Sequence, residues 1–176
     1  NSIENFNNDT VNPLVSSLLN LLSPYHKRAA ETLYKNVARL IELAPSINHI
    51  GFVTLTFKDN VTDAKEANRR FDSFNTNFLG PSDDFGEWVK IMEPQKRGAW
   101  HYHLLVILKD DIRTGINFDE LAQRKYSSAS PALRKLWSKL RIACDLYGFG
   151  RSEMLPIRST QEAMARYIGK YITKGI

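Results

Sequence analysis

Cysteine is scarce in this chain, with Cys144 the only one among 176 residues. A lone thiol cannot form an internal disulfide, so the cross-linked framework of small secreted proteins is excluded, and we expect Cys144 to be buried as a small apolar residue. No segment approaches the ~20 consecutive apolar residues of a membrane span, and the first residues lack the basic region of a signal peptide. We therefore expect a protein that is neither exported nor embedded in a membrane, and that works in the cytoplasm.

Internal repeats and low-complexity segments are also absent. The length of 176 residues and the 43% hydrophobic content suit a folded chain with a sizeable core, and we expect a single domain over residues 1–176 with a helical segment, 1–48, packed on it. The sequence starts without methionine and stops just after its last motif. We expect a fragment of a longer protein.

The charge is distributed unevenly along the chain. Residues 124–176 hold eleven Lys and Arg against three Asp and Glu, whereas residues 51–123 hold nine against twelve. A basic C-terminal third suits a polyanion such as a nucleic acid, although a solvated basic face would have the same composition. The candidate contacts to a nucleic acid are Lys96, Arg97, Arg158 and Arg166.

Hydrophobic periodicity predicts helices and strands in alternation. Proline or serine marks the helix starts, and β-branched and aromatic residues mark the strands. The predicted helices run from Pro24 until Pro45, from 63 to 79, from Pro131 until Gly148 and from Ser159 to Lys174. The predicted strands cover 52–57, 87–93 and 100–108, with a short edge strand at 150–157.

Two of the four histidines, His101 and His103, lie two residues apart in the apolar run 100–106. Side chains alternate faces along a strand, so both imidazoles point the same way. A Pro and Gly turn at 94–98 brings Glu93 beside them from the preceding strand. Two imidazoles and a carboxylate with open coordination positions suit Mg²⁺ or Mn²⁺ bound together with a phosphate, although two solvent-facing histidines are the plain alternative.

The last predicted helix carries Tyr167 and Tyr171 four residues apart, hence on one face. A buried tyrosine pair would give the same spacing, but each tyrosine is followed three residues later by a lysine, Lys170 or Lys174, and lysines sit poorly in a core. A phenol is a weak nucleophile at neutral pH and needs an activated electrophile. A metal ion that polarises a phosphodiester, with lysines neutralising charge, would supply one. The combination predicts transesterification through a phosphotyrosine.

These motifs resemble the HUH endonuclease superfamily, in particular the two-tyrosine rolling-circle replication initiators of phages and plasmids. The resemblance rests on the strand 52–57, the motif His101-Tyr102-His103 and the tyrosine helix, in that order. It implies an α+β fold with a central antiparallel, ferredoxin-like sheet flanked by helices. The metal ligands would be Glu93, His101 and His103.

The resemblance further implies an enzyme that nicks and rejoins single-stranded DNA at an origin, with or without a hairpin. Tyr167 and Tyr171 would form the 5′-phosphotyrosine in turn, and Lys170 and Lys174 would contact phosphate or help proton transfer. Host helicase and polymerase would be partners in the bacterial cytoplasm. Two alternatives stay open: a two-tyrosine transposase, and a non-catalytic nucleic-acid-binding module with a ferredoxin-like sheet.

Overall fold

The computed structural model describes residues 13–175, without the side chains of residues 13, 14, 168 and 170–175. The chain divides into two compact units. The sheet unit consists of residues 48–156, and the helical unit combines the residues up to 47 with those from 157 onward. The expected single domain over 1–176 stays a prediction.

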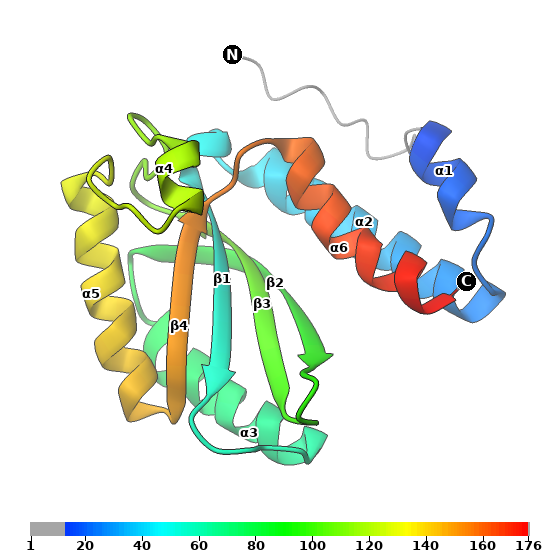
Figure 1. Cartoon of the computed structure of the whole chain (residues 1–176), viewed down its shortest axis with the longest axis horizontal. Coiled ribbons are helices and arrows are strands. Elements are labelled where there is room, and N and C mark those ends of the chain that lie inside the picture. The colour runs from blue at the N-terminus through cyan, green and yellow to red at the C-terminus, as the bar shows by residue number, and fades with distance from the viewer. Residues whose placement is uncertain (1–12, 176) are drawn as a thin grey trace. The chain divides into compact units, whose positions relative to one another are not determined.

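A four-stranded antiparallel sheet forms the centre of the sheet unit (Figure 1). Its strands are β1 (Ile50–Phe57), β2 (Phe85–Pro94), β3 (Trp100–Leu108) and β4 (Phe149–Pro156), in the spatial order β2-β3-β1-β4. A helix connects β1 to β2 and another connects β3 to β4, which is the split βαβ arrangement of ferredoxin-like folds. The predicted antiparallel α+β fold is confirmed, and β4 is the predicted edge strand.

The register of the strands gives the sheet two chemically different faces. His101 of β3 lies opposite Glu93 of β2 and Thr56 of β1, and His103 lies opposite Thr54. Because side chains alternate along each strand, these polar residues share one face. Tyr102, between the histidines, points to the other face and is fully buried.

The hydrophobic core of the sheet unit lies on the face to which Tyr102 points. Helices α3 (Ala64–Phe74) and α5 (Pro131–Leu146) contribute to it together with the sheet. Phe71 and Phe74 are completely buried, so the phenylalanine stripe predicted at helical spacing packs in the core. The aromatic rings stack closely, with the ring centroids of Phe57 and Phe149 4.8 Å apart.

The helix boundaries follow the predicted caps, with one difference. The side-chain oxygens of Ser130 and Asp63 accept backbone N–H bonds at the starts of α5 and α3. The helix predicted over 63–79 is α-helical only to Phe74 and continues as one π-type turn, Asn75–Leu79. The apolar spacing is shared by both forms, so periodicity alone did not separate them.

The helical unit contains α1 (Pro13–Leu19), α2 (Pro24–Leu43) and α6 (Thr160–Gly175), and α2 packs along α6. Ser23 caps α2 as predicted, and Ser159 caps α6 by accepting the backbone N–H of Glu162 at 3.1 Å. Neither α1 nor the short α4 (Phe118–Ala122) of the sheet unit was predicted, because both are too brief to show a period. Within the described chain, no helix is long and apolar enough to cross a membrane.

Candidate metal centre

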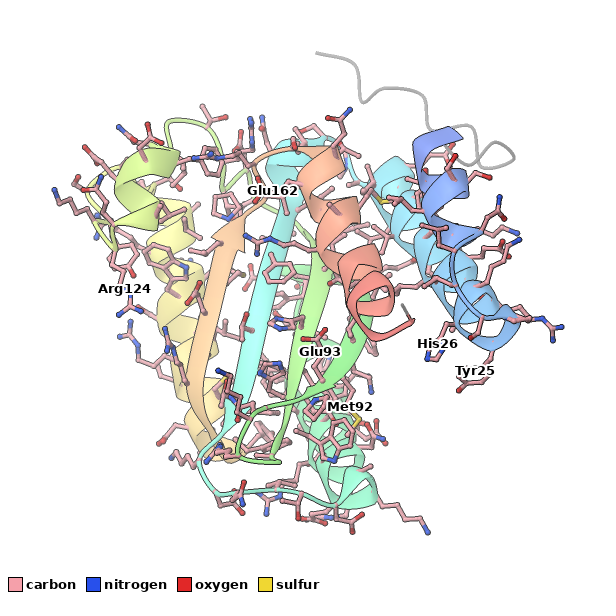
Figure 2. The ribbon with its side chains drawn as sticks, turned by 45° about the vertical axis from the view of Figure 1, so that its right-hand side comes forward. Tyr25, His26, Met92, Glu93, Arg124 and Glu162 are labelled. Atoms are coloured by element: carbon pink, nitrogen blue, oxygen red, sulfur yellow. The ribbon has the colours of Figure 1, made fainter. Side chains whose placement is uncertain are left out.

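Three donor atoms meet on the polar face of the sheet where β2 and β3 run side by side. The Nε2 atom of His101 lies 3.4 Å from Oε2 of Glu93, and the Nε2 atom of His103 lies 3.5 Å from the same oxygen. Figure 2 labels Glu93 at this position on β2. All three side chains are partly buried, so they are shielded from water but still reachable by a ligand.

The turn between β2 and β3 fixes this meeting. The Gln95 amide donates to the carbonyl of Ala99 at 2.7 Å, and the Gly98 amide donates to the carbonyl of Gln95 at 2.9 Å. Gly98 has a φ of 87°, a left-handed conformation that glycine adopts without steric cost. The turn therefore sets the register that places Glu93 opposite His101.

The donor set fits a divalent ion. Two ligands at about 2.1 Å from a metal, 90° to 110° apart, are about 3.0 to 3.5 Å from each other. The two measured separations, 3.4 and 3.5 Å, fall within this range, whereas a direct hydrogen bond between imidazole and carboxylate would be shorter. Two imidazoles and one carboxylate leave coordination positions for water or phosphate oxygens.

Thr54 of β1 orients one of the imidazoles, and sequence reasoning missed it. Its Oγ1 atom lies 3.1 Å from Nδ1 of His103. If Nδ1 carries the proton and donates to this oxygen, the lone pair of His103 is on Nε2, the atom that faces Glu93. The Phe52 ring stacks on the same imidazole with centroids 5.3 Å apart. His103 is thus held from two sides.

The sequence contained only part of this signal. The alternation of residues 52–57 puts Phe52 and Thr54 on one face, but it does not give the register of β1 against β3. Only the pairing of Thr54 with His103, found in the folded sheet, assigns the hydroxyl to that imidazole.

Two other reactive residue types are excluded from the centre by burial. Tyr102 donates its hydroxyl to Asn68 at 2.9 Å on the core side, and burial raises the pKa of this phenol. Cys144 is buried in α5, as predicted, and burial raises the pKa of its thiol to about 12. Neither group is an accessible nucleophile.

The candidate nucleophiles belong to the helical unit. Tyr167 lies on α6 and is 1% exposed. The side chains of Lys170, Tyr171 and Lys174 lie outside the described residues, although the helix that carries them is the predicted one. The structure thus brings together the three predicted metal ligands and leaves the roles of the tyrosines and lysines as predictions.

The basic residues proposed to contact DNA have different surroundings. Lys96 and Arg158 are exposed. Arg97 donates to the side chain of Gln95 and to the carbonyl of Phe57, so it supports the turn. Arg166 pairs with Glu162 one helical turn away, at 3.3 Å. A contact to DNA by any of these four stays a prediction.

A ferredoxin-like sheet that presents a His-x-His motif and a carboxylate on one face, followed by a helix with paired tyrosines, defines the class of Rep-type initiators of phages and plasmids. Within this class the chain belongs to the family of the replication-associated protein ORF2, whose model matches residues 50–176. The predicted resemblance to rolling-circle initiators is confirmed at this level.

A curated relative supports the same assignment. The chain is 46% identical over its entire length to the Phasyl DNA replicon protein arp of Escherichia coli. It spans 60% of the length of that relative. No solved structure is significantly similar to the chain.

Proposed function

We propose that this chain initiates replication of a phage or plasmid by nicking and rejoining single-stranded DNA through a phosphotyrosine. The observation that carries the proposal is the cluster of Glu93, His101 and His103 in a member of a replication-associated family. The name of the relative, a DNA replicon protein, favours replication over transposition.

The metal centre would hold the scissile phosphate. A divalent ion bound there would polarise the non-bridging oxygens and offset the charge that develops on them. The protein's own contribution is to fix the donor geometry: the turn at Gly98 holds Glu93 opposite His101, and Thr54 orients His103. Fixed donors need no rearrangement when the charge develops.

In the proposed reaction, the hydroxyl oxygen of Tyr167 or Tyr171 forms a bond to phosphorus and the bond to the 3′ oxygen breaks. The phenol loses one proton and the leaving oxygen gains one, so the products are a 5′-phosphotyrosine and a free 3′-OH without consumption of water. The reverse reaction joins a 3′-OH to the held 5′ end. Lys170 and Lys174 would neutralise phosphate charge or carry the proton.

The burial of Tyr167 bears on the order of the two tyrosines. Its side chain is 1% exposed, so its hydroxyl reaches a phosphodiester only after α6 exposes it. Single Tyr167→Phe and Tyr171→Phe variants therefore test which tyrosine cuts first. Helicase and polymerase of the host would act on the nicked product.

The experiment is adduct formation on denaturing gels. The protein is incubated with Mn²⁺ and short single strands tiled across the replicon's origin region, and a covalent protein–DNA band is expected. The double variant Tyr167→Phe with Tyr171→Phe should lose the band. Tyr25→Phe is the matched control, since Tyr25 is an exposed tyrosine of the same unit and should leave the band intact.

Two results would contradict the proposal. An adduct that persists in the double variant shows that another residue is the nucleophile. DNA binding without metal dependence and without any adduct identifies a non-catalytic binding module instead.

A further inference from the structure

A cleft lies beside the free edge of β4, on the side of the sheet away from β2. It has a volume of about 270 Å³ and runs between β4 and α5, which Figure 1 shows alongside each other. The buried side chains of Leu140 and Met154 are among those that line it. Nothing in the metal centre accounts for this cleft.

Two aromatic residues line the cleft and are held in place. Trp137 donates its indole N–H to the carbonyl of Met154 at 2.6 Å, which fixes the ring against the edge of β4. Tyr126 packs edge-to-face on Trp137 with centroids 5.4 Å apart, yet remains 44% exposed. A large aromatic side chain left in water beside a cleft offers a surface for a flat ligand.

The loop that carries Tyr126 is itself restrained. Arg134 of α5 donates to the carbonyls of Tyr126 and Ala129 at 2.6 and 3.2 Å. Arg124, labelled in Figure 2, adopts a left-handed φ of 60°, which costs energy for a non-glycine residue. A strained backbone conformation is retained when its surroundings fix it, so Tyr126 is presented in one position.

Two guanidinium groups complete the lining. Arg141 lies one helical turn after Trp137 on α5, is exposed, and has no ion-pair partner among the described residues. Arg151 of β4 has a distant partner, Glu153 at 3.7 Å, and its side chain is 66% exposed. Exposed guanidinium groups next to an exposed aromatic ring match a nucleotide, which combines a phosphate with a flat base.

The register connects this cleft to the metal centre. Arg151 pairs with Thr56, Thr56 pairs with His101, and His101 pairs with Glu93, so all four lie in one row across the sheet. At about 4.8 Å between neighbouring strands the row is about 14 Å long, a span of a few nucleotides of a single strand. Side-chain alternation puts Arg151 on the same face as the histidines.

We propose that the cleft between α5 and β4 binds one nucleotide of the single-stranded substrate, a few nucleotides from the phosphate at the metal centre. Its phosphate contacts Arg141 and Arg151, and its base packs on Tyr126. This inference rests on the proposed function, because it assigns a second contact on the same DNA strand.

The test is fluorescence anisotropy with a labelled oligothymidylate of about 20 nucleotides, without metal, over a range of salt concentrations. Each phosphate contact to a single strand contributes about 0.7 to the slope of log affinity against log salt. The double variant Arg141→Gln with Arg151→Gln should bind about 10-fold more weakly and lose about 1.4 from the slope. Lys135→Gln is the matched control, because Lys135 is an exposed cation of α5 that does not line the cleft.

The aromatic contact is tested separately. Tyr126→Ala should weaken binding about fivefold to tenfold with the salt slope unchanged, because stacking releases no counterions, and Tyr126→Phe should bind as the parent protein does. A strand containing 5-iodouracil should photo-crosslink to the peptide that carries Tyr126. All variants should melt at the parent temperature, since the altered side chains are exposed.

The outcomes separate this inference from the proposed function. Parent-like affinity and slope in the cleft variants, or crosslinks only elsewhere, overturn the cleft as a nucleotide site even if the adduct forms. Weakened binding in the cleft variants together with no adduct leaves the cleft as a DNA contact and removes the nicking activity.

Discussion

The two ends of the row across the sheet are built differently. At the β2–β3 end, Glu93, His101 and His103 are partly buried, with side chains 27%, 18% and 21% exposed, and at least one of them is oriented by a neighbouring hydroxyl. At the β4 edge, Arg151 is 66% exposed and its carboxylate partner is 3.7 Å away. The first end holds its donor atoms in place before any ligand arrives, whereas the second leaves its charges available to a partner. Chemistry at a phosphate needs fixed donors, and recognition of a flexible strand does not.

The largest effect is expected from removing the donors. His101→Ala with His103→Ala should weaken Mn²⁺ binding by more than about 100-fold in calorimetric titration, because a lone carboxylate holds the ion poorly. His26→Ala is the control, since His26 bonds to Ser23 on α2 and not to the donor set. Unchanged Mn²⁺ affinity in the double variant would show that the ion binds elsewhere.

A smaller effect is expected from the hydroxyl behind the donors. Thr54→Val should weaken Mn²⁺ binding about 10-fold, because Nδ1 of His103 loses the partner that orients the ring. Thr54→Ser should restore the affinity. Thr56→Val is the matched control on the same face of β1, and its affinity should stay within about twofold of the parent protein.

The ¹⁵N chemical shifts of the His103 ring provide a readout independent of metal. The parent protein without metal should show the proton on Nδ1, and Thr54→Val should show a mixture of tautomers. Identical spectra in the two proteins would remove Thr54 as a positioning residue.

At the other end of the row the expected effect is smaller and has the opposite sign. Glu153→Gln should strengthen binding of the labelled oligothymidylate about twofold, because a carboxylate that repels phosphate and pairs with Arg151 is removed. Asp110→Asn, at an exposed position away from the cleft, should leave the affinity unchanged. Weaker binding by Glu153→Gln would mean that the Arg151–Glu153 pair itself shapes the cleft.

The smallest effect is expected from charges that serve neither end of the row. Arg69 and Arg70 hold the pKa of Glu66 down to about 2, and Arg70 also lowers the pKa of Asp59. A carboxyl with a lowered folded-state pKa stabilises the protein above its unfolded value of 4.5 and loses that contribution as the pH falls toward 2. The melting temperature should therefore fall modestly over this range, and the difference between the parent protein and Arg70→Gln should narrow. A constant difference would show that Arg70 stabilises by packing on Phe57 instead.

Much of the site could be predicted because it follows from local rules. The alternation of a strand put His101 and His103 on one face and Tyr102 on the other, and a Pro and Gly turn between two strands made Glu93 their neighbour. The helix caps at Ser130 and Ser159 follow from the need of the first backbone N–H groups for an acceptor. Each of these inferences depends on residues close together in the chain.

The tertiary structure decided what depends on distant segments. Thr54 meets His103 across 49 residues, and Arg151 joins the row of the donors only through the pairing of β4 with β1. The cleft requires Tyr126, Trp137 and the edge of β4 at once. A shift of one residue in register would turn each of these side chains to the opposite face, and register is set by the packing of the whole sheet, so the sequence determined the candidate metal donors while the fold alone determined the residues that orient them and the cleft beside them.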